Sequence, residues 1–252
     1  MNKETVQNEY SEYSIYYKQL QKEIFDFLNK LKDVGYKNID IAEVKTRPGN
    51  GIKSLESINN NIDRKDKYTK HHNLLDIKDI AGVRVVCHCE DDLAAFSEIV
   101  ENKLNEARFL DVKREDKPEL GQNSSNPKSR PSYRAVHITL AKKYKHKGDS
   151  IRIYCEVQLR TVMADAWAVQ DRLYLYGDDR PEGDRHVLTD AVSEIMKGCE
   201  SLWALVKKKC RDGQAVDSKE FEAIKSFAIE KPSPSEQEDI RKFDLDLKKD
   251  NL

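Results

Sequence analysis

The segment 151–160 alternates apolar residues with residues whose side chains can do chemistry. Its apolar set is Ile151, Ile153, Cys155, Val157 and Leu159, and its polar set includes Arg152, Glu156, Gln158 and Arg160. A β-strand points residues two apart to the same face of a sheet. One face of this strand therefore joins a core, and the other presents an acid, an amide and guanidinium groups. The same alternation is also typical of a strand with a plain solvent-exposed face.

A second carboxylate gives the polar face a chemical meaning. Asp79 precedes the β-branched run 83–86, and Arg84 lies within that run. An aspartate before a structured element is commonly a capping residue. Two carboxylates from different strands can also hold Mg²⁺ between substrate oxygens, and arginine binds phosphate through two parallel hydrogen bonds. The pattern thus indicates a site for phosphoryl transfer.

A third strand adds an aromatic ring and an imidazole. Tyr133 and His137 share one face of the predicted strand 133–140, which follows a loop containing Lys128. An aromatic ring can stack on a nucleotide base, although such residues are also common packing residues. The sequence contains neither the P-loop motif nor the Gly-x-Gly-x-x-Gly motif, so the usual nucleotide-binding loops do not explain the chain.

The bulk composition limits the function classes. The chain has 252 residues, of which 38% are hydrophobic and 35% charged, and its net charge is −1. A phosphate site must therefore be built locally, because the average surface does not attract anions. No apolar run is long enough to span a membrane and no apolar signal segment is seen, so we expect a cytoplasmic protein without a membrane partner. The five cysteines have no zinc-finger spacing and are expected to be reduced structural thiols.

The elements that must position these residues alternate along the chain. Helical spacing predicts helices at 1–32, 52–64, 93–104, 162–176 and 188–206, and strands are predicted at 39–45, 82–87, 109–112, 133–140 and 151–160. A polar loop is predicted at 114–131 and a basic turn at 142–147. Adjacent strands late in the chain predict an α+β fold, with a mixed β-sheet of about five strands flanked by helices.

Four regions are expected along the chain. They are an N-terminal helix at 1–36, the α+β domain at 37–180, C-terminal helices at 181–228 and a polar tail at 229–252.

Five segments, in order, resemble the synthetase domain of RelA/SpoT-type alarmone synthetases, here as a single small domain. They are KSLESI at 53–58, DIAGVRV at 79–85, PK at 127–128 with YRAVH at 133–137, EVQLRT at 156–161 and WA at 167–168. The resemblance implies a nucleotidyltransferase-like synthetase fold with helical additions at both ends. It also implies transfer of pyrophosphate from ATP to the 3′-hydroxyl of GDP or GTP, which makes (p)ppGpp in the stringent response.

The resemblance implies a role for each matching residue. Asp79 and Glu156 would be catalytic and hold Mg²⁺, with Glu156 binding metal or activating the 3′-hydroxyl. The residues implied for the donor ATP are Arg47, Lys53, Ser57 and Arg84. Those implied for the acceptor are Lys128, Tyr133, His137, Gln158 and Arg160, with Tyr133 stacked on guanine. A homo-oligomer, dimer or tetramer, formed through terminal helices is also implied.

The sequence departs from the family pattern mainly on the donor side. Gly51 stands where the family usually has arginine, and Asn61 stands where it usually has lysine. Arg47 would supply the missing guanidinium if 49–52 is an insertion. Ser132 and Arg172 replace a usual glycine and a usual histidine. The metal and acceptor positions match the pattern.

Two alternatives remain open from the sequence. ATP could be the donor to a different hydroxyl, on an adenosine nucleotide or at the 3′ end of tRNA, with the basic run 142–147 against the RNA backbone. A nucleotide-binding protein that has lost donor chemistry is the other alternative.

Overall fold

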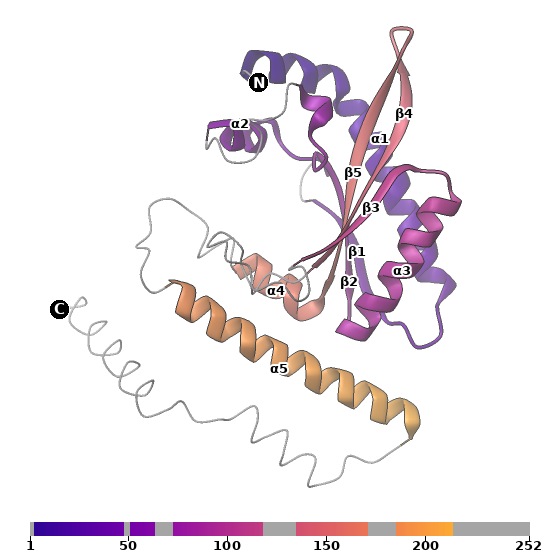
Figure 1. Cartoon of the computed structure of the whole chain (residues 1–252), viewed down its shortest axis with the longest axis vertical. Helices are drawn as coiled ribbons and strands as arrows, with labels where there is room; N and C mark the ends of the chain where they lie inside the picture. Colours follow the sequence, from indigo (N-terminus) through magenta and orange to yellow (C-terminus); the bar gives the residue numbers. More distant parts are fainter. Residues whose placement is uncertain (1–2, 48–50, 64–72, 118–134, 171–184, 214–252) are drawn as a thin grey trace, which may run out of the picture. The chain divides into compact units, whose positions relative to one another are not determined.

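The computed structural model describes residues 3–47, 51–63, 73–117, 135–170 and 185–213 (Figure 1). In these residues the helices are α1 (Lys3–Val34), α2 (Leu55–Asp63), α3 (Glu90–Glu106), α4 (Val162–Gln170) and α5 (Arg185–Asp212), with a short 3₁₀ helix η1 (Leu74–Asp76). The strands are β1 (Ile41–Thr46), β2 (Ala81–Cys87), β3 (Leu110–Lys117), β4 (Ala135–His146) and β5 (Asp149–Thr161). No helix in the described residues is long and apolar enough to cross a membrane.

The five strands form one mixed sheet in the order β1-β2-β5-β4-β3. Strands β2 and β5 run parallel, while the other neighbouring pairs are antiparallel. The predicted α+β class, with about five strands flanked by helices, is therefore confirmed. The parallel pair sets Gly82 directly opposite Glu156.

One face of the sheet is covered by helices. The apolar stripe of α1, with Tyr17, Leu20, Ile24 and Leu28 fully buried, packs in one core cluster with Phe96 of α3 and the apolar residues of β2, β4 and β5. Because neighbouring strand residues point to opposite faces, the polar side chains of β5 project away from this core. Figure 1 shows α1 and α3 together beside the sheet.

Local sequence explains where several elements begin and end. Gly35 follows α1 with φ of 67°, the left-handed conformation that commonly terminates helices. Thr161 ends β5 and caps α4, since its hydroxyl accepts a hydrogen bond from the Ala164 amide at 3.1 Å. Helix α4 therefore starts directly after the polar strand.

The basic turn predicted at 142–147 is corrected by the structure. Residues 142–146 belong to β4, and the turn is Lys147-Gly148, which joins the paired residues His146 and Asp149. Both turn residues have positive φ, 49° and 95°, as a tight two-residue hairpin requires. The polar strand end is held by α1, where Glu12 contacts His146 and Glu23 contacts Lys142. Tertiary contacts therefore outweigh the turn-like composition.

The first residues of the loop predicted at 114–131 belong to a strand instead. Residues 114–117 continue β3 and pair with β4, where Lys117 lies opposite Ala135. The rest of that predicted loop lies outside the described residues. The free thiols agree with the sequence expectation, because Cys87, Cys89 and Cys155 are buried and no disulfide joins the five cysteines.

The chain divides into two compact units, residues 1–200 and 201–252. The first unit contains the sheet and all the helices up to Glu200 in α5. In the second unit, the described part is the end of α5, which closes at Gly213 with φ of 63°. The boundaries expected at 36, 180 and 228 remain predictions.

Candidate active site

Glu156 lies in the middle of the polar face and is held at both carboxylate oxygens. The Nδ1 atom of His137 on β4 lies 2.9 Å from Oε1, and Nε2 of Gln158 donates to Oε2 at 2.6 Å. Both the His137 and Glu156 side chains are largely buried. Because an ionised carboxylate is an acceptor, Nδ1 of His137 carries the proton in this pair.

The surroundings of Glu156 keep it ionised. Burial raises the pKa of this carboxyl group, but the hydrogen bond and charge of His137, together with Gln158, outweigh burial and the nearby charge of Asp79. The net pKa lies below the usual value for glutamate. At neutral pH Glu156 is therefore a carboxylate, able to bind a cation or accept a proton.

Asp79 lies just before β2 and forms a buried ion pair with Lys53. The two residues are 9% and 8% exposed, and Lys53 Nζ lies 2.9 Å from Asp79 Oδ2. The pair is positioned by backbone contacts, since the Lys53 amide donates to the Ile80 carbonyl at 2.8 Å and Ile52 bridges Ala81. Residues 52 and 53 thus continue along β2 beyond the end of β1.

Arg47 reaches the same place from the end of β1. Its Nη2 atom donates to the Asp79 carbonyl at 3.0 Å. A Cβ atom added at Gly82 would lie 3.2 Å from Nε of Arg47 and 3.7 Å from the Glu156 carbonyl oxygen. The absence of a side chain at Gly82 therefore lets the guanidinium of Arg47 lie over β2, next to the strand that carries Glu156.

Sequence reasoning missed a third acid, Asp165 on α4. It is 7% exposed, and its carboxylate lies 2.7 Å from Lys45 Nζ, 2.7 Å from Arg84 Nη1 and 3.8 Å from Arg160 Nη1. Burial raises the pKa of Asp165, but the cations, Lys45 foremost, lower it by more than burial raises it. The net pKa is therefore below the usual value for aspartate. One acid in the otherwise apolar stretch 162–169, directly after the polar strand, is the signal that identifies it in hindsight.

Gln158 connects Glu156 to two of the cations around Asp165, Arg84 and Arg160. Its amide nitrogen donates to Glu156, and its amide oxygen accepts from Arg84 and Arg160, each at 3.3 Å. The polar face is thus one network that runs from Glu156 to Asp165 across β2, β5 and α4. A network in which each member is held by its neighbours fixes the side chains in place before a ligand binds.

The predicted site residues fall into three groups. The structure brings together Arg47, Lys53, Asp79, Arg84, His137, Glu156, Gln158 and Arg160. Ser57 lies on α2, where its amide donates to the Ser54 hydroxyl, so Ser54 caps the helix. Lys128 and Tyr133 lie outside the described residues, as do Ser132 and Arg172.

Two carboxylates on neighbouring segments fit a magnesium ion. Asp79 raises the pKa of Glu156 through its charge, so the two groups lie within electrostatic reach of each other. Magnesium is commonly held by one or two carboxylates, and phosphate oxygens and water complete its shell. No group of three or more His, Cys, Asp or Glu side chains that could hold a metal occurs in the described part of the chain. A magnesium ion held by these two carboxylates would take its remaining ligands from phosphate oxygens and water.

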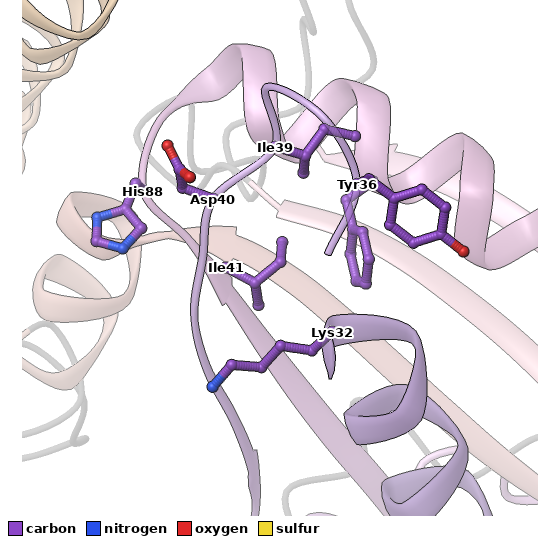
Figure 2. A pocket seen from close by; sticks show the side chains of 7 residues that line it. Lys32, Tyr36, Ile39, Asp40, Ile41 and His88 are labelled. Atoms are coloured by element: carbon purple, nitrogen blue, oxygen red, sulfur yellow. The ribbon is translucent and has the colours of Figure 1, made fainter. Parts of the chain in front are cut away.

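A cavity lies elsewhere, between α1, the start of β1 and α3 (Figure 2). Its volume is about 260 Å³. Figure 2 shows Lys32 of α1 at this cavity, together with Tyr36, which follows α1, and with Asp40 and His88. It lies on the helix-covered side of the sheet, and its lining includes none of the described acidic or basic groups around Glu156. This cavity is therefore not part of the polar site around Glu156.

Comparisons with known proteins agree with the fold. Residues 50–178, about half of the chain, match the family model described as a region found in RelA / SpoT proteins. A GTP pyrophosphokinase family protein from Streptococcus pneumoniae is 22% identical, with a TM-score of 0.61, covering 82% of this chain and 96% of that one. Small alarmone synthetase 1 from Bacillus subtilis is 20% identical, with a TM-score of 0.63, covering 81% and 99%. No curated protein sequence matches the chain.

The Bacillus subtilis enzyme also has solved structures with nucleotides. One is bound to its product pppGpp, with a TM-score of 0.62 and 20% identity, covering 80% of this chain and 97% of that one. Another is bound to AMPCPP, with a TM-score of 0.58 and 18% identity, covering 81% and 98%.

Proposed function

The chain belongs to the RelA/SpoT family, and we propose that it transfers pyrophosphate from ATP to the 3′-hydroxyl of GDP or GTP, forming (p)ppGpp. The observation that carries this proposal is the ionised Glu156 beside the Asp79–Lys53 pair, with Arg47 over Gly82. An anionic base and three charged groups for phosphate and metal are then contained in one buried patch. An enzyme that uses ATP and guanosine nucleotides in this way would act in the cytoplasm.

Glu156 would accept the proton of the 3′-hydroxyl as that oxygen attacks the β-phosphorus of ATP and AMP leaves. His137 and Gln158 hold the carboxylate at 2.9 and 2.6 Å, so its orientation is set before the substrate arrives. A positioned base of this kind contributes about 10²- to 10⁴-fold to a rate.

The donor phosphates would meet the cations that converge on Asp79. Lys53 and Arg47 both contact Asp79. Arg84 lies on β2 and contacts Gln158. Cations held in a buried site stabilise developing charge without reorganising during the reaction. Asp79 and Glu156 would hold Mg²⁺, which supplies further neutralisation of phosphate charge when it is bound. Ser57 is assigned to the donor by resemblance.

The acceptor side rests on β4 and β5. We assign His137, Gln158 and Arg160 to the acceptor nucleotide, and by resemblance also Lys128 and Tyr133, with Tyr133 stacked on guanine. Arg160 is almost fully buried and is held by Gln158 and Asp165, so its positive charge has a fixed position.

A homo-oligomer, dimer or tetramer, is proposed as the working state. Val192 and Ile195 in the first unit are exposed by 49% and 66%, although large apolar side chains are usually buried. Trp203 in the second unit is 59% exposed. Exposed apolar residues three apart on a helix present one apolar face, which suits a second copy of the chain.

The experiment offers ATP and Mg²⁺ with GDP, GTP, GMP, AMP or tRNA in separate reactions, and identifies products by mass. The expected product is GDP or GTP heavier by one diphosphate, with AMP released. Glu156→Gln and Asp79→Asn should each lower transfer about 100-fold or more while leaving the fold intact. Glu23→Gln, a matched change in a surface ion pair with Lys142, should keep full turnover.

The other outcomes separate the alternatives. A product from AMP or tRNA would move the acceptor to an adenosine nucleotide or RNA. The contacts of Lys142 and Lys147 with glutamates of α1 give the RNA alternative less support, because two charges of its basic run are already paired. Normal nucleotide binding without any transfer, unchanged by Glu156→Gln, would favour a binding protein.

A further inference from the structure

Gln21 is a buried polar residue in the apolar face of α1. It is 5% exposed and lies next to Leu20, one turn away from Tyr17 and Ile24, all three of which are fully buried. Helix α1 lies outside the residues 50–178 that match the family model. A buried amide must find hydrogen-bond partners, and those of Gln21 lie on the site side of the core.

Its amide nitrogen joins two backbone segments. Nε2 of Gln21 donates to the Gly82 carbonyl at 3.0 Å and also to the Gly51 carbonyl. Both partners are acceptors, so the side chain must supply two N–H donors from one atom. Among side chains of this size an amide does so, whereas a carboxylate has acceptors alone at neutral pH and leucine has neither.

Gly51 is shaped to receive this amide. Its φ is 78°, which side-chain-bearing residues rarely adopt. A Cβ atom built there would lie 2.9 Å from Nε2 and 3.0 Å from Cδ of Gln21. The Gln21 side chain therefore fills the space that a side chain at position 51 would need, which explains why a glycine stands there.

Gly51 in turn connects to both cations at Asp79. It forms an antiparallel bridge with Arg47, whose guanidinium reaches the Asp79 carbonyl. Lys53 follows two residues later and pairs with the Asp79 side chain. Gly82, the second partner of Gln21, lies opposite Glu156. One buried amide thus ties the segment that carries Arg47 and Lys53 to the strand beside the candidate base.

We propose that Gln21 is a positioning residue for the donor half of the site. It would act on ATP binding indirectly, by holding the segment that carries Arg47 and Lys53. The proposal rests on the proposed function and adds to it a residue outside the family region. The described hydrogen bonds of Gln21 go to Gly51 and Gly82, and not to the acceptor half on β4 and β5. A defect at Gln21 should therefore separate the two substrates.

The kinetic test uses Gln21→Leu and Gln21→Glu in the full chain. Each should raise KM for ATP about tenfold, the effect expected from the loss of one to two hydrogen bonds, and leave KM for the guanosine acceptor within about twofold. Arg47→Ala should show the same separation. Ile24→Val, which shortens a fully buried side chain one turn away on α1, should lower Tm without separating the two KM values. Equal changes for both substrates, or an unchanged KM for ATP, would overturn the proposal.

A measurement without catalysis keeps this test distinct from the proposed function. Hydrogen–deuterium exchange of the ligand-free protein should be faster in the peptide covering 51–54 for Gln21→Leu than for Ile24→Val, because the Lys53 amide depends on this segment. Equal exchange in both variants would refute the positioning role. If the wild-type chain transfers no pyrophosphate, exchange and the affinity for α,β-methylene-ATP still decide the role of Gln21, and the failure falls on the proposed function alone.

Discussion

Asn in place of Asp165 would remove one negative charge from the point where Lys45, Arg84 and Arg160 meet. The substitution changes little in size, so it tests charge rather than packing. Three cations would then face one another across α4, β1, β2 and β5 with a neutral amide between them. We expect the fold to persist with a clear loss of stability.

The magnitude follows from the geometry. Arg84 and Lys45 both lie 2.7 Å from the carboxylate, but the Arg84 side chain is 22% exposed and the Lys45 side chain one-third exposed, so solvent weakens the Lys45 contact more. Arg160 is buried but 3.8 Å away. Hydrogen bonds to charged groups are worth about 1.5–3 kcal/mol, and breaking a buried pair costs about 3–5 kcal/mol. Since two of the partners are partly exposed, a loss of about 3 kcal/mol is expected, or a fall in Tm of about 6–12 °C.

Urea unfolding at several pH values provides the assay. The pKa of Asp165 is lowered in the folded state, so its contribution is present above the unfolded pKa, about 3.9, and is lost as the pH falls through the folded value. The difference between wild type and Asp165→Asn should therefore be full at pH 7 and shrink below about pH 4. Asp26→Asn, at an exposed position of α1, should stay within about 0.5 kcal/mol.

A double-mutant cycle isolates the contact between Asp165 and Arg84. Asp165→Asn combined with Arg84→Met should show a coupling of about 1–3 kcal/mol, because the two side chains touch directly. The reasoning would be refuted if Asp165→Asn cost less than about 1 kcal/mol at pH 7, or if its effect were the same at pH 3 as at pH 7.

Two further outcomes are expected. Removing the imidazole with His137→Phe leaves burial as the dominant influence on Glu156, so its pKa should rise and the acid limb of the kcat/KM profile should move to higher pH; an unmoved limb would show that Glu156 is not the group whose protonation limits kcat/KM. Light scattering should give a mass of two or four chains, and Trp203→Glu should lower it, because a charge replaces an exposed apolar side chain; a wild-type monomer would contradict the proposed assembly.

Elements of the fold were predictable wherever periodicity was strong. The alternation at 151–160 predicts β5 and its polar face, and helical spacing predicts α1 to within two residues of its end at Val34. The extent of β4 was not predictable, because 142–146 is polar and its place in a strand depends on Glu12 and Glu23 of α1, far away in sequence. Local composition does not report such contacts.

The candidate site was predictable as a set of residue types but not as a network. The placement of Glu156 opposite Gly82, and of Arg84 opposite Gln158, depends on the register between two parallel strands, which single-strand patterns do not contain. Asp165 was missed for a related reason. Its importance comes from three cations on three other segments, and two of them, Lys45 and Arg84, are distant from it in sequence.

Gly51 shows what the structure adds to a position-by-position comparison of the donor side. Where the family has arginine, glycine reads as the loss of a cation near the triphosphate. In the structure, Arg47 and Gly51 are bridged, and the residues next to them, Thr46 and Ile52, both pair with β2. Arg47 then contacts Asp79 from a different point in the sequence. If pyrophosphate transfer requires a guanidinium at a point in space rather than at a position in a motif, Arg47 would supply it, and Gln21 with Gly51 would hold the backbone that places it.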